Sequence, residues 1–250
     1  MRILTLLIFL ACATGSTYGQ ECSNFDYESV FTASRLTSPG GLQNADRRMK
    51  NNPMEADVIL MGDSLPQGWS KESLDAVFEG SVVANYGVGG SLIENTLWFM
   101  TGVAAAQPSA HLVILWVGTN NWSNGAKPCA IQAGLVNLLV QARLAWPKAE
   151  IALIGLSHRG AMLGFNRQEI EEINNHLALE RLGRGYRFID INKALDCWGR
   201  APVEREVTMY ADDRTNFTCR YYRDDWLHLT EEGYEAAGNF IRQQLVDILD

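Results

Sequence analysis

The chain has 250 residues, of which 47% are hydrophobic and 20% are charged, and its formal net charge is −8. These values are typical of a globular protein that is long enough to bury a substantial core. The acidic balance and the lack of any basic run argue against a partner bound through a phosphate backbone, so we expect no nucleic-acid partner.

Residues 1–19 have the pattern of a secretory signal peptide. Arg2 precedes an apolar run that only Thr5 interrupts, and small residues follow up to Gly19. We predict cleavage after Gly19, a mature domain over residues 20–250 and a secreted location, extracellular or periplasmic. Cleavage a few residues earlier stays open. The apolar run is too short to span a bilayer comfortably and no other stretch comes close, so we expect no stable membrane insertion.

Four cysteines follow the predicted signal peptide: Cys22, Cys129, Cys197 and Cys219. An even number in an exported chain predicts two disulfides, and four cysteines allow three connectivities. We predict the pair Cys197–Cys219, which closes an irregular segment before the last helix, and the pair Cys22–Cys129. No cysteine or histidine cluster has the spacing of metal ligands, so we expect no metal and no other cofactor. Sequons at Asn121 and Asn216 are glycosylation candidates.

Strands alternate with helices from residue 57 onward. Residues 21–53 are polar and predict an irregular lead-in that has room for one short helix. Apolar runs predict strands over residues 57–61, 81–86, 111–117, 151–156 and 186–189. Helical patterns predict helices over residues 71–78, 92–103, 129–146 and 167–182, and a last helix that begins after Thr230. This order predicts a single-domain α/β fold, with a doubly wound, flavodoxin-like five-stranded parallel sheet flanked by helices.

Residues that can carry chemistry follow three of these strands and precede the last helix. Ser64 follows the first strand, residues 87–90 (GVGG) follow the second, and residues 118–121 (GTNN) follow the third. Asp225 and His228 lie just before the last helix. Because the carboxyl ends of parallel strands share one edge of a sheet, we expect these groups to converge there.

These stretches resemble the GDSL/SGNH hydrolase superfamily. The matching motifs are residues 57–65 (DVILMGDSL), 85–90 (NYGVGG), 116–121 (WVGTNN) and 225–229 (DWLHL). The resemblance extends from about residue 56 to the C-terminus. It is strongest to the branch that contains the catalytic subunits of intracellular platelet-activating-factor acetylhydrolase.

The resemblance implies a serine esterase. It assigns Ser64 as the nucleophile, His228 as the general base and Asp225 as the carboxylate that orients the imidazole. The oxyanion would be held by the backbone N–H groups of Ser64 and Gly90 and by the side-chain amide of Asn120.

The resemblance also implies an acyl pocket walled by Leu65, Thr119 and Leu227. Two leucines beside the reacting carbonyl leave room for a methyl group, so we expect a preference for acetyl esters. The alternative is that the leucines only pack the core and the acyl chain leaves along another groove.

Several residues have a second interpretation. Residues 87–89 resemble the start of a dinucleotide fingerprint, but Leu92 stands where its third glycine would be. Asp224 is an alternative to Asp225, and Asn120 would also suit an ordinary turn. His158 lies at the same sheet edge and is a candidate substrate contact.

The function that we predict is removal of short acyl groups, most of all acetyl, from acetylated carbohydrate by a secreted serine ester hydrolase. Phospholipid or other lipid esters are the alternative substrates, and a non-catalytic secreted binding protein on the same fold is the alternative of another class. The expected partner is a small-molecule or polysaccharide ester. The oligomeric state does not follow from the sequence.

Overall fold

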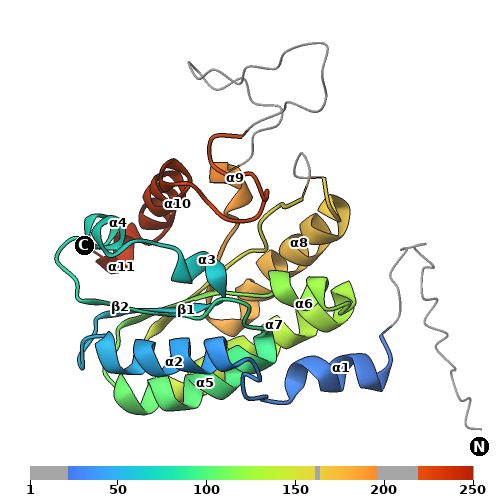
Figure 1. Ribbon diagram of the computed structural model, residues 1–250, viewed down its shortest axis with the longest axis horizontal. Helices are drawn as coiled ribbons and strands as arrows, with labels where there is room; N and C mark the ends of the chain where they lie inside the picture. Colours follow the sequence, from blue (N-terminus) through green and yellow to red (C-terminus); the bar gives the residue numbers. More distant parts are fainter. Residues whose placement is uncertain (1–21, 161–163, 196–218, 250) are drawn as a thin grey trace, which may run out of the picture.

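The computed structural model describes residues 22–160, 164–195 and 219–249. A five-stranded parallel sheet of order β2-β1-β3-β4-β5 lies between two layers of helices (Figure 1). The strands are β1 Val58–Gly62, β2 Val83–Gly87, β3 Leu112–Trp116, β4 Glu150–Ile154 and β5 Arg187–Ile189. The helices are α1 Asn24–Phe31, α2 Pro39–Asn51, α3 Ser64–Gln67, α4 Lys71–Val77, α5 Ile93–Ala106, α6 Thr119–Ser123, α7 Pro128–Ala145, α8 Arg167–Arg184, α9 Asn192–Leu195, α10 Glu231–Gln244 and α11 Val246–Leu249. The predicted fold class is confirmed.

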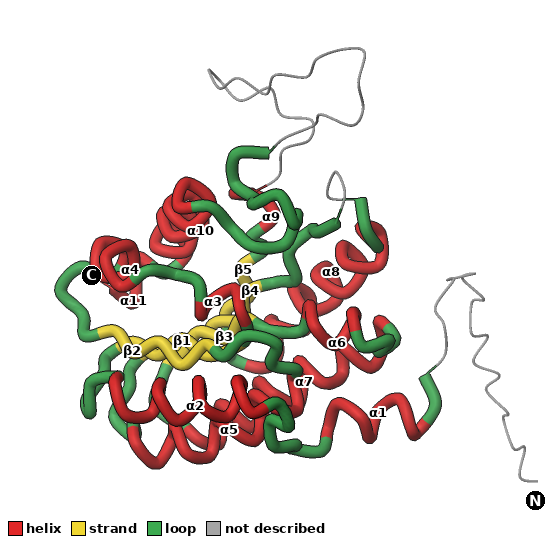
Figure 2. Tube along the Cα trace, viewed as in Figure 1, coloured by secondary structure: helices red, strands yellow, loops and turns green. Residues whose placement is uncertain are grey.

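The sheet is buried on both faces, which explains its nearly continuous apolar strands. Along β1, Ile59 and Met61 point into the core beneath α2, α5, α7 and α8, whereas Val58 and Leu60 point into the core beneath α4, α9 and α10. Figure 2 shows the strands as a central layer with helices on either side. Each strand therefore contributes side chains to two cores.

The strand order creates a switch point beside β1. β1 pairs with β2 on one side and with β3 on the other, so the chain winds outward in both directions from this strand. The segments that follow β1 and β3 therefore separate from each other at their carboxyl ends, where ligands bind in open α/β sheets. Gly62 ends β1 with a φ of +149°, and a Cβ there would lie 1.9 Å from the carbonyl oxygen of Trp116. Only glycine fits this position.

The lead-in differs from its prediction, because most of it forms two helices, α1 and α2 (Figure 2). Ser23 and Asp26 form a reciprocal capping box that begins α1. Ser38 caps α2 and Pro39 occupies its first turn, where a missing N–H costs little. The glycines after Pro39 hid this helix in the sequence, since they suggest a turn.

A disulfide joins Cys22 to Cys129, one of the two predicted pairs, with a Cα–Cα distance of 6.1 Å. It connects the residue before the cap of α1 to the first turn of α7. The Nζ of Lys127 lies 3.0 Å from Oδ2 of Asp26 beside it. Cys219 is also disulfide-bonded, and its predicted partner Cys197 lies outside the described residues.

We expect Cys22→Ser to destabilise the protein. The disulfide closes a segment with a sequence separation of 107, for which the chain-entropy model gives about 4–5 kcal/mol of unfolding free energy. Urea unfolding without reductant measures the difference. With reductant, wild type and variant should unfold at the same urea concentration. Equal midpoints without reductant would contradict a stabilising role.

Candidate active site

Ser64, His228 and Asp225 lie together at the carboxyl edge of the sheet. Ser64 begins α3 directly after β1, and its Oγ lies 2.9 Å from Nε2 of His228. Nδ1 of the same imidazole lies 2.6 Å from Oδ2 of Asp225. With Nδ1–H donating to the carboxylate, Nε2 is left to accept the serine proton. This is the arrangement that activates a serine hydroxyl.

The loop that carries His228 is closed on itself. The backbone N–H groups of Leu227 and His228 donate to Oδ1 of Asp225 at 3.0 and 2.9 Å, and the N–H of Arg223 donates to the carbonyl of His228 at 2.8 Å. Trp226 has a φ of +52°, a strained value for a residue with a side chain. This left-handed backbone conformation makes a tight turn between Asp225 and His228, which lets the carboxylate reach the imidazole.

The environment of Asp225 favours its ionised form. Partial burial by itself raises the pKa of this carboxyl, but hydrogen bonds from the His228 side chain and from the N–H groups of His228 and Leu227 outweigh it and lower the pKa to about 2. Asp225, and not the alternative Asp224, is the carboxylate that contacts the imidazole, and it is ionised throughout the neutral range.

Tyr234 connects the nucleophile segment to the helix that follows the histidine. This residue of α10 donates its hydroxyl to the carbonyl of Leu65 at 2.7 Å, and its ring stacks on Trp69 with centroids 5.7 Å apart. Burial raises the pKa of Tyr234, so it remains a donor at all physiological pH values. No motif in the sequence marked Tyr234 as a residue of the site.

Two asparagines after β3 have different tasks. Asn120, the predicted oxyanion donor, gives one amide hydrogen to the carbonyl of Ser91 at 3.0 Å, and its amide carries a second. Asn121 is 2% exposed, donates to Oε2 of Glu94 and accepts from the N–H of Ile93, both at 2.9 Å. The prediction that Asn121 is a glycosylation acceptor is therefore wrong for the folded chain. Asn216 lies outside the described residues.

The residues predicted to wall an acyl pocket are held in different ways. Leu65 is 2% exposed and packs in the core with residues of α4 and α10. The Thr119 hydroxyl accepts from Nη1 of Arg159 at 2.7 Å. Leu227 is partly exposed on the catalytic loop. Their joint role stays a prediction, and Leu227 is the accessible member of the three.

Arg159 and its neighbour Gly160 connect α6 to the catalytic loop, and no sequence motif indicated this role. The guanidinium of Arg159 donates to the carbonyl of Thr119 at 2.8 Å and to the Ser123 hydroxyl at 2.9 Å, both in α6. The N–H of the next residue, Gly160, donates to the carbonyl of Trp226 in the catalytic loop at 2.9 Å. The one available signal was a cation after β4, at the same sheet edge as the triad.

His158, a candidate substrate contact, is only 3% exposed. Its backbone N–H donates to Oδ1 of Asn192 at 2.7 Å, and its Nε2 lies 3.4 Å from Oε1 of Glu171. These contacts make it part of the framework below the loop, so the substrate-contact interpretation is wrong.

Asp63, the residue before the nucleophile, is completely buried. Its Oδ1 accepts the N–H of Leu65 at 2.9 Å, which begins α3. Burial raises the pKa of Asp63 to about 7, and the hydrogen bond from Leu65 and the positive charge of Arg159 oppose this only in part. In contrast to Asp225, this carboxyl beside the nucleophile therefore titrates near neutral pH.

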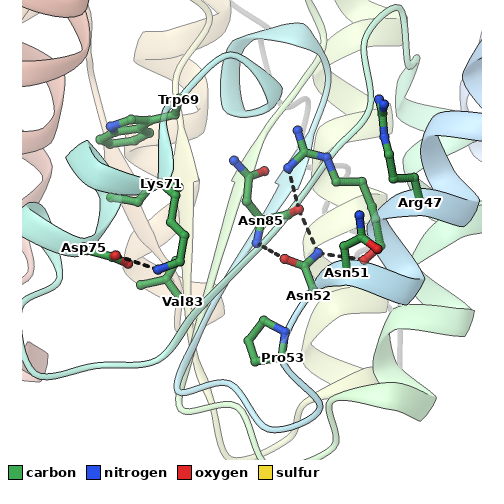
Figure 3. Close-up of a pocket in the computed structure, with 11 residues that line it drawn as sticks. Arg47, Asn51, Asn52, Pro53, Trp69, Lys71, Asp75, Val83 and Asn85 are labelled. Carbon is green, nitrogen blue, oxygen red and sulfur yellow. Dashed lines mark hydrogen bonds and ion pairs between the residues drawn. The ribbon is translucent and has the colours of Figure 1, made fainter.

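A separate cavity of about 280 Å³ lies along β2, between α2 and α4 (Figure 3). The guanidinium of Arg48 donates there to the carbonyl oxygens of Asn85 and Gln67 at 3.2 and 3.1 Å. The Asn52 side chain donates to the carbonyl of Asn85 and accepts its N–H, at 2.9 and 3.0 Å. These groups occupy the free edge of the sheet, which protects it from pairing with another strand.

Within residues 22–160, 164–195 and 219–249, no group of three or more His, Cys, Asp or Glu residues could hold a metal ion. No helix in this part of the chain is both long enough and apolar enough to cross a bilayer.

Comparisons with known proteins identify a matching family, similar sequences and similar folds. The model of the GDSL-like lipase/acylhydrolase family matches residues 56–236. Human platelet-activating factor acetylhydrolase IB subunit alpha2 is 30% identical over 199 residues, which cover 78% of this chain and 79% of the relative. Among solved structures, a carbohydrate acetylesterase from Sinorhizobium meliloti is similar with a TM-score of 0.58 and 16% identity, over 76% of this chain and 98% of the other. A GDSL-like lipase from Bacteroides thetaiotaomicron is similar with a TM-score of 0.59 and 17% identity, over 82% and 97%.

These relatives correct one prediction. The platelet-activating factor acetylhydrolase IB subunits that the chain matches are intracellular, which contradicts the secreted location, extracellular or periplasmic, that we predicted. Residues 1–19, on which the prediction was based, lie outside the described residues. The proposed function therefore includes no location.

The raised pKa of Asp63 predicts a pH-dependent stability difference between wild type and Asp63→Asn. A buried carboxyl with a folded pKa of about 7 stabilises fully below its unfolded pKa, and this contribution is lost as pH rises through 7. The asparagine variant keeps the acceptor for Leu65 but does not titrate. Its free energy of unfolding relative to wild type should therefore rise between pH 4 and pH 8, by an amount on the order of a few kcal/mol. Urea unfolding across this range measures the effect, and a difference independent of pH would contradict the assignment.

Proposed function

Because this chain belongs to the GDSL-like lipase/acylhydrolase family and is a carboxylic ester hydrolase, we propose that it removes acetyl groups through Ser64, His228 and Asp225. The observation that carries this proposal is the unbroken pair of hydrogen bonds from Oγ of Ser64 through the imidazole to the carboxylate. The resemblance of the chain to GDSL hydrolases, first drawn from its motifs, is confirmed.

The geometry supports a two-step mechanism. His228 takes the proton of Ser64 while Oγ attacks the ester carbon, and Asp225 stabilises the imidazolium that forms. The negative oxygen of the tetrahedral intermediate accepts from the N–H groups of Ser64 and Gly90 and from the Asn120 amide. The imidazolium then gives its proton to the leaving alcohol, which leaves an acetyl-enzyme. Water, deprotonated by the same imidazole, releases acetate and restores the serine.

We propose an acetylated carbohydrate as the natural substrate. Two aromatic residues lie at this site: Trp226 in the catalytic loop is partly exposed, and Phe165 in the segment beside it is 46% exposed. Both adjoin Gly160, which donates to the carbonyl of Trp226 and lies against Cβ of Phe165. Exposed rings of this kind suit the apolar faces of sugars. A carbohydrate acetylesterase has the same fold.

An acetyl phospholipid is the alternative substrate, because the curated relatives are platelet-activating factor acetylhydrolase subunits. Acetylated xylan, acetylated monosaccharides and acetyl phospholipid should be compared at equal ester concentration. A higher kcat/KM for the carbohydrate esters supports the proposal, and a higher value for the phospholipid replaces it.

We expect Ser64→Ala and His228→Ala each to lower turnover of p-nitrophenyl acetate by about 10³-fold or more, because each removes a member of one catalytic unit. Asp225→Asn should also be severe, since the imidazole then adopts the wrong tautomer. Asp224→Asn is the matched control and should keep wild-type turnover. Labelling of the wild type, but not of Ser64→Ala, by a fluorophosphonate probe identifies the nucleophile. Failure of the wild type to react would favour a non-catalytic binding protein instead.

The proposed acetyl preference predicts that rates fall with acyl length. Crowding of a longer chain typically costs about 1–3 kcal/mol, so kcat/KM for p-nitrophenyl octanoate should lie about one to two decades below that for the acetate. Leu227→Ala should improve the octanoate selectively, whereas Leu179→Ala, exposed on α8, should change neither ester. Rates that stay level or rise with chain length would refute the acyl pocket.

A further inference from the structure

The turn that carries Gly90 has two consecutive glycines at its centre. The N–H of Ser91 donates to the carbonyl of Val88 at 3.1 Å and closes the turn around Gly89 and Gly90. The φ of Gly90 is +77°, whereas that of Gly89 is not positive, so the turn is of type II. Because neither glycine has a Cβ, the peptide between them rotates at little cost. The N–H of Gly90 belongs to this peptide, and its direction therefore depends on support from outside the turn.

Gln67 supplies that support from the nucleophile helix. It is the last residue of α3, three positions after Ser64, and its Oε1 accepts the N–H of Gly89 at 2.6 Å. A Cβ on Gly89 would lie 3.2 Å from this Oε1 and 3.4 Å from Nε2, so the side-chain amide lies flat against the turn. One short helix thus carries the nucleophile at its start and holds the oxyanion turn from its end.

Helix α2 in turn holds Gln67. The amide nitrogen of Asn44 donates to the same Oε1 of Gln67, and Nη2 of Arg47 donates to Oδ1 of Asn44 at 2.9 Å. The main chain of Gln67 is held as well, because Nη2 of Arg48 donates to its carbonyl at 3.1 Å. All three residues precede residue 56, where the match to the family model begins.

We propose that Gln67 is a positioning residue for the oxyanion hole and that Asn44 of α2 acts through it. This inference rests on the proposed function, which gives the N–H of Gly90 its role. Without Oε1, the N–H of Gly89 loses its anchor and the central peptide of the turn rotates, so that the N–H of Gly90 points away from the reacting oxygen. The negative charge on that oxygen develops only in the transition state, so the loss falls on kcat rather than on KM.

Gln67→Met tests this, since it keeps the length of the side chain and removes the acceptor. We expect kcat for p-nitrophenyl acetate to fall by about 10- to 100-fold, less than the loss of a whole oxyanion donor, with KM within about twofold of wild type. Affinity for a boronic acid that forms a tetrahedral adduct with Ser64 should fall by the same factor as kcat/KM. Asn44→Ala should have a smaller effect of the same kind. The double variant should be no worse than Gln67→Met alone, because both residues act through one oxygen.

Gln43→Ala is the matched control, because Gln43 is an exposed neighbour of Asn44 on α2. It should keep wild-type kcat and KM. If Gln67→Met does not fold, Asn44→Ala with the same readouts decides the question. A kcat near wild type in these variants, a change in KM alone, or fully additive effects in the double variant would overturn the proposal. If Ser64→Ala kept its turnover, the proposed function itself would fail, so the two failures can be told apart.

Discussion

The hydrogen bond between Nε2 of His228 and Oγ of Ser64 joins residues that are 164 positions apart, and the site exists only if both ends are held still. At one end, Gly62 packs so closely against the carbonyl oxygen of Trp116 that no side chain fits there, which fixes the backbone at the end of β1, just before Ser64. At the other, an internal hydrogen-bonded loop fixes the imidazole. Tyr234 joins the two ends through the carbonyl of Leu65. A serine hydroxyl is a weak nucleophile, so the distance between Oγ of Ser64 and Nε2 of His228 decides whether the hydroxyl can be activated.

Two aspartates near this bond show how burial and hydrogen bonding compete. Asp63 is completely buried with one backbone donor, and desolvation raises its pKa to about 7. Asp225 is half-exposed and accepts from two N–H groups and an imidazole, which hold its pKa at about 2. The first shapes the turn that presents Ser64, and the second stays charged to orient His228. Because both residues are aspartates, the difference between their pKa values comes from their surroundings and not from their residue type.

The proposed oxyanion hole combines glycines of high conformational freedom with hydrogen bonds from other segments. Glycines let the backbone approach a substrate carbonyl, but they do not define the direction of an N–H. Here Gln67 fixes the turn before Gly90, and Arg159 fixes Thr119 beside Asn120. Neither Gln67 nor Arg159 belongs to the four sequence motifs. Gln67 is itself held by Asn44 of α2, which lies outside the segment that the family model matches.

Local pattern by itself determined the strands, most of the later helices and the order of the motifs. Strands buried on both faces are continuous apolar runs, and parallel strands bring their carboxyl ends to one edge whatever the loops contain. That Ser64, Asp225 and His228 would meet at this edge could be expected from their places in the chain, whereas their predicted catalytic roles came from the resemblance of the motifs to GDSL hydrolases. The helices of the lead-in could not, because Pro39 and the glycines after it suit both a turn and a helix start.

Contacts between distant segments were decided by the tertiary structure alone. Three such contacts join residues more than 20 positions apart. Asn121 donates to Glu94, Arg159 donates to Thr119 of α6, and Gln67 accepts the N–H of Gly89. None of these side chains belongs to a periodic pattern that would reveal its partner. Periodicity shows which face of an element is buried, but a side chain's hydrogen-bond partner depends on which other elements fold against it.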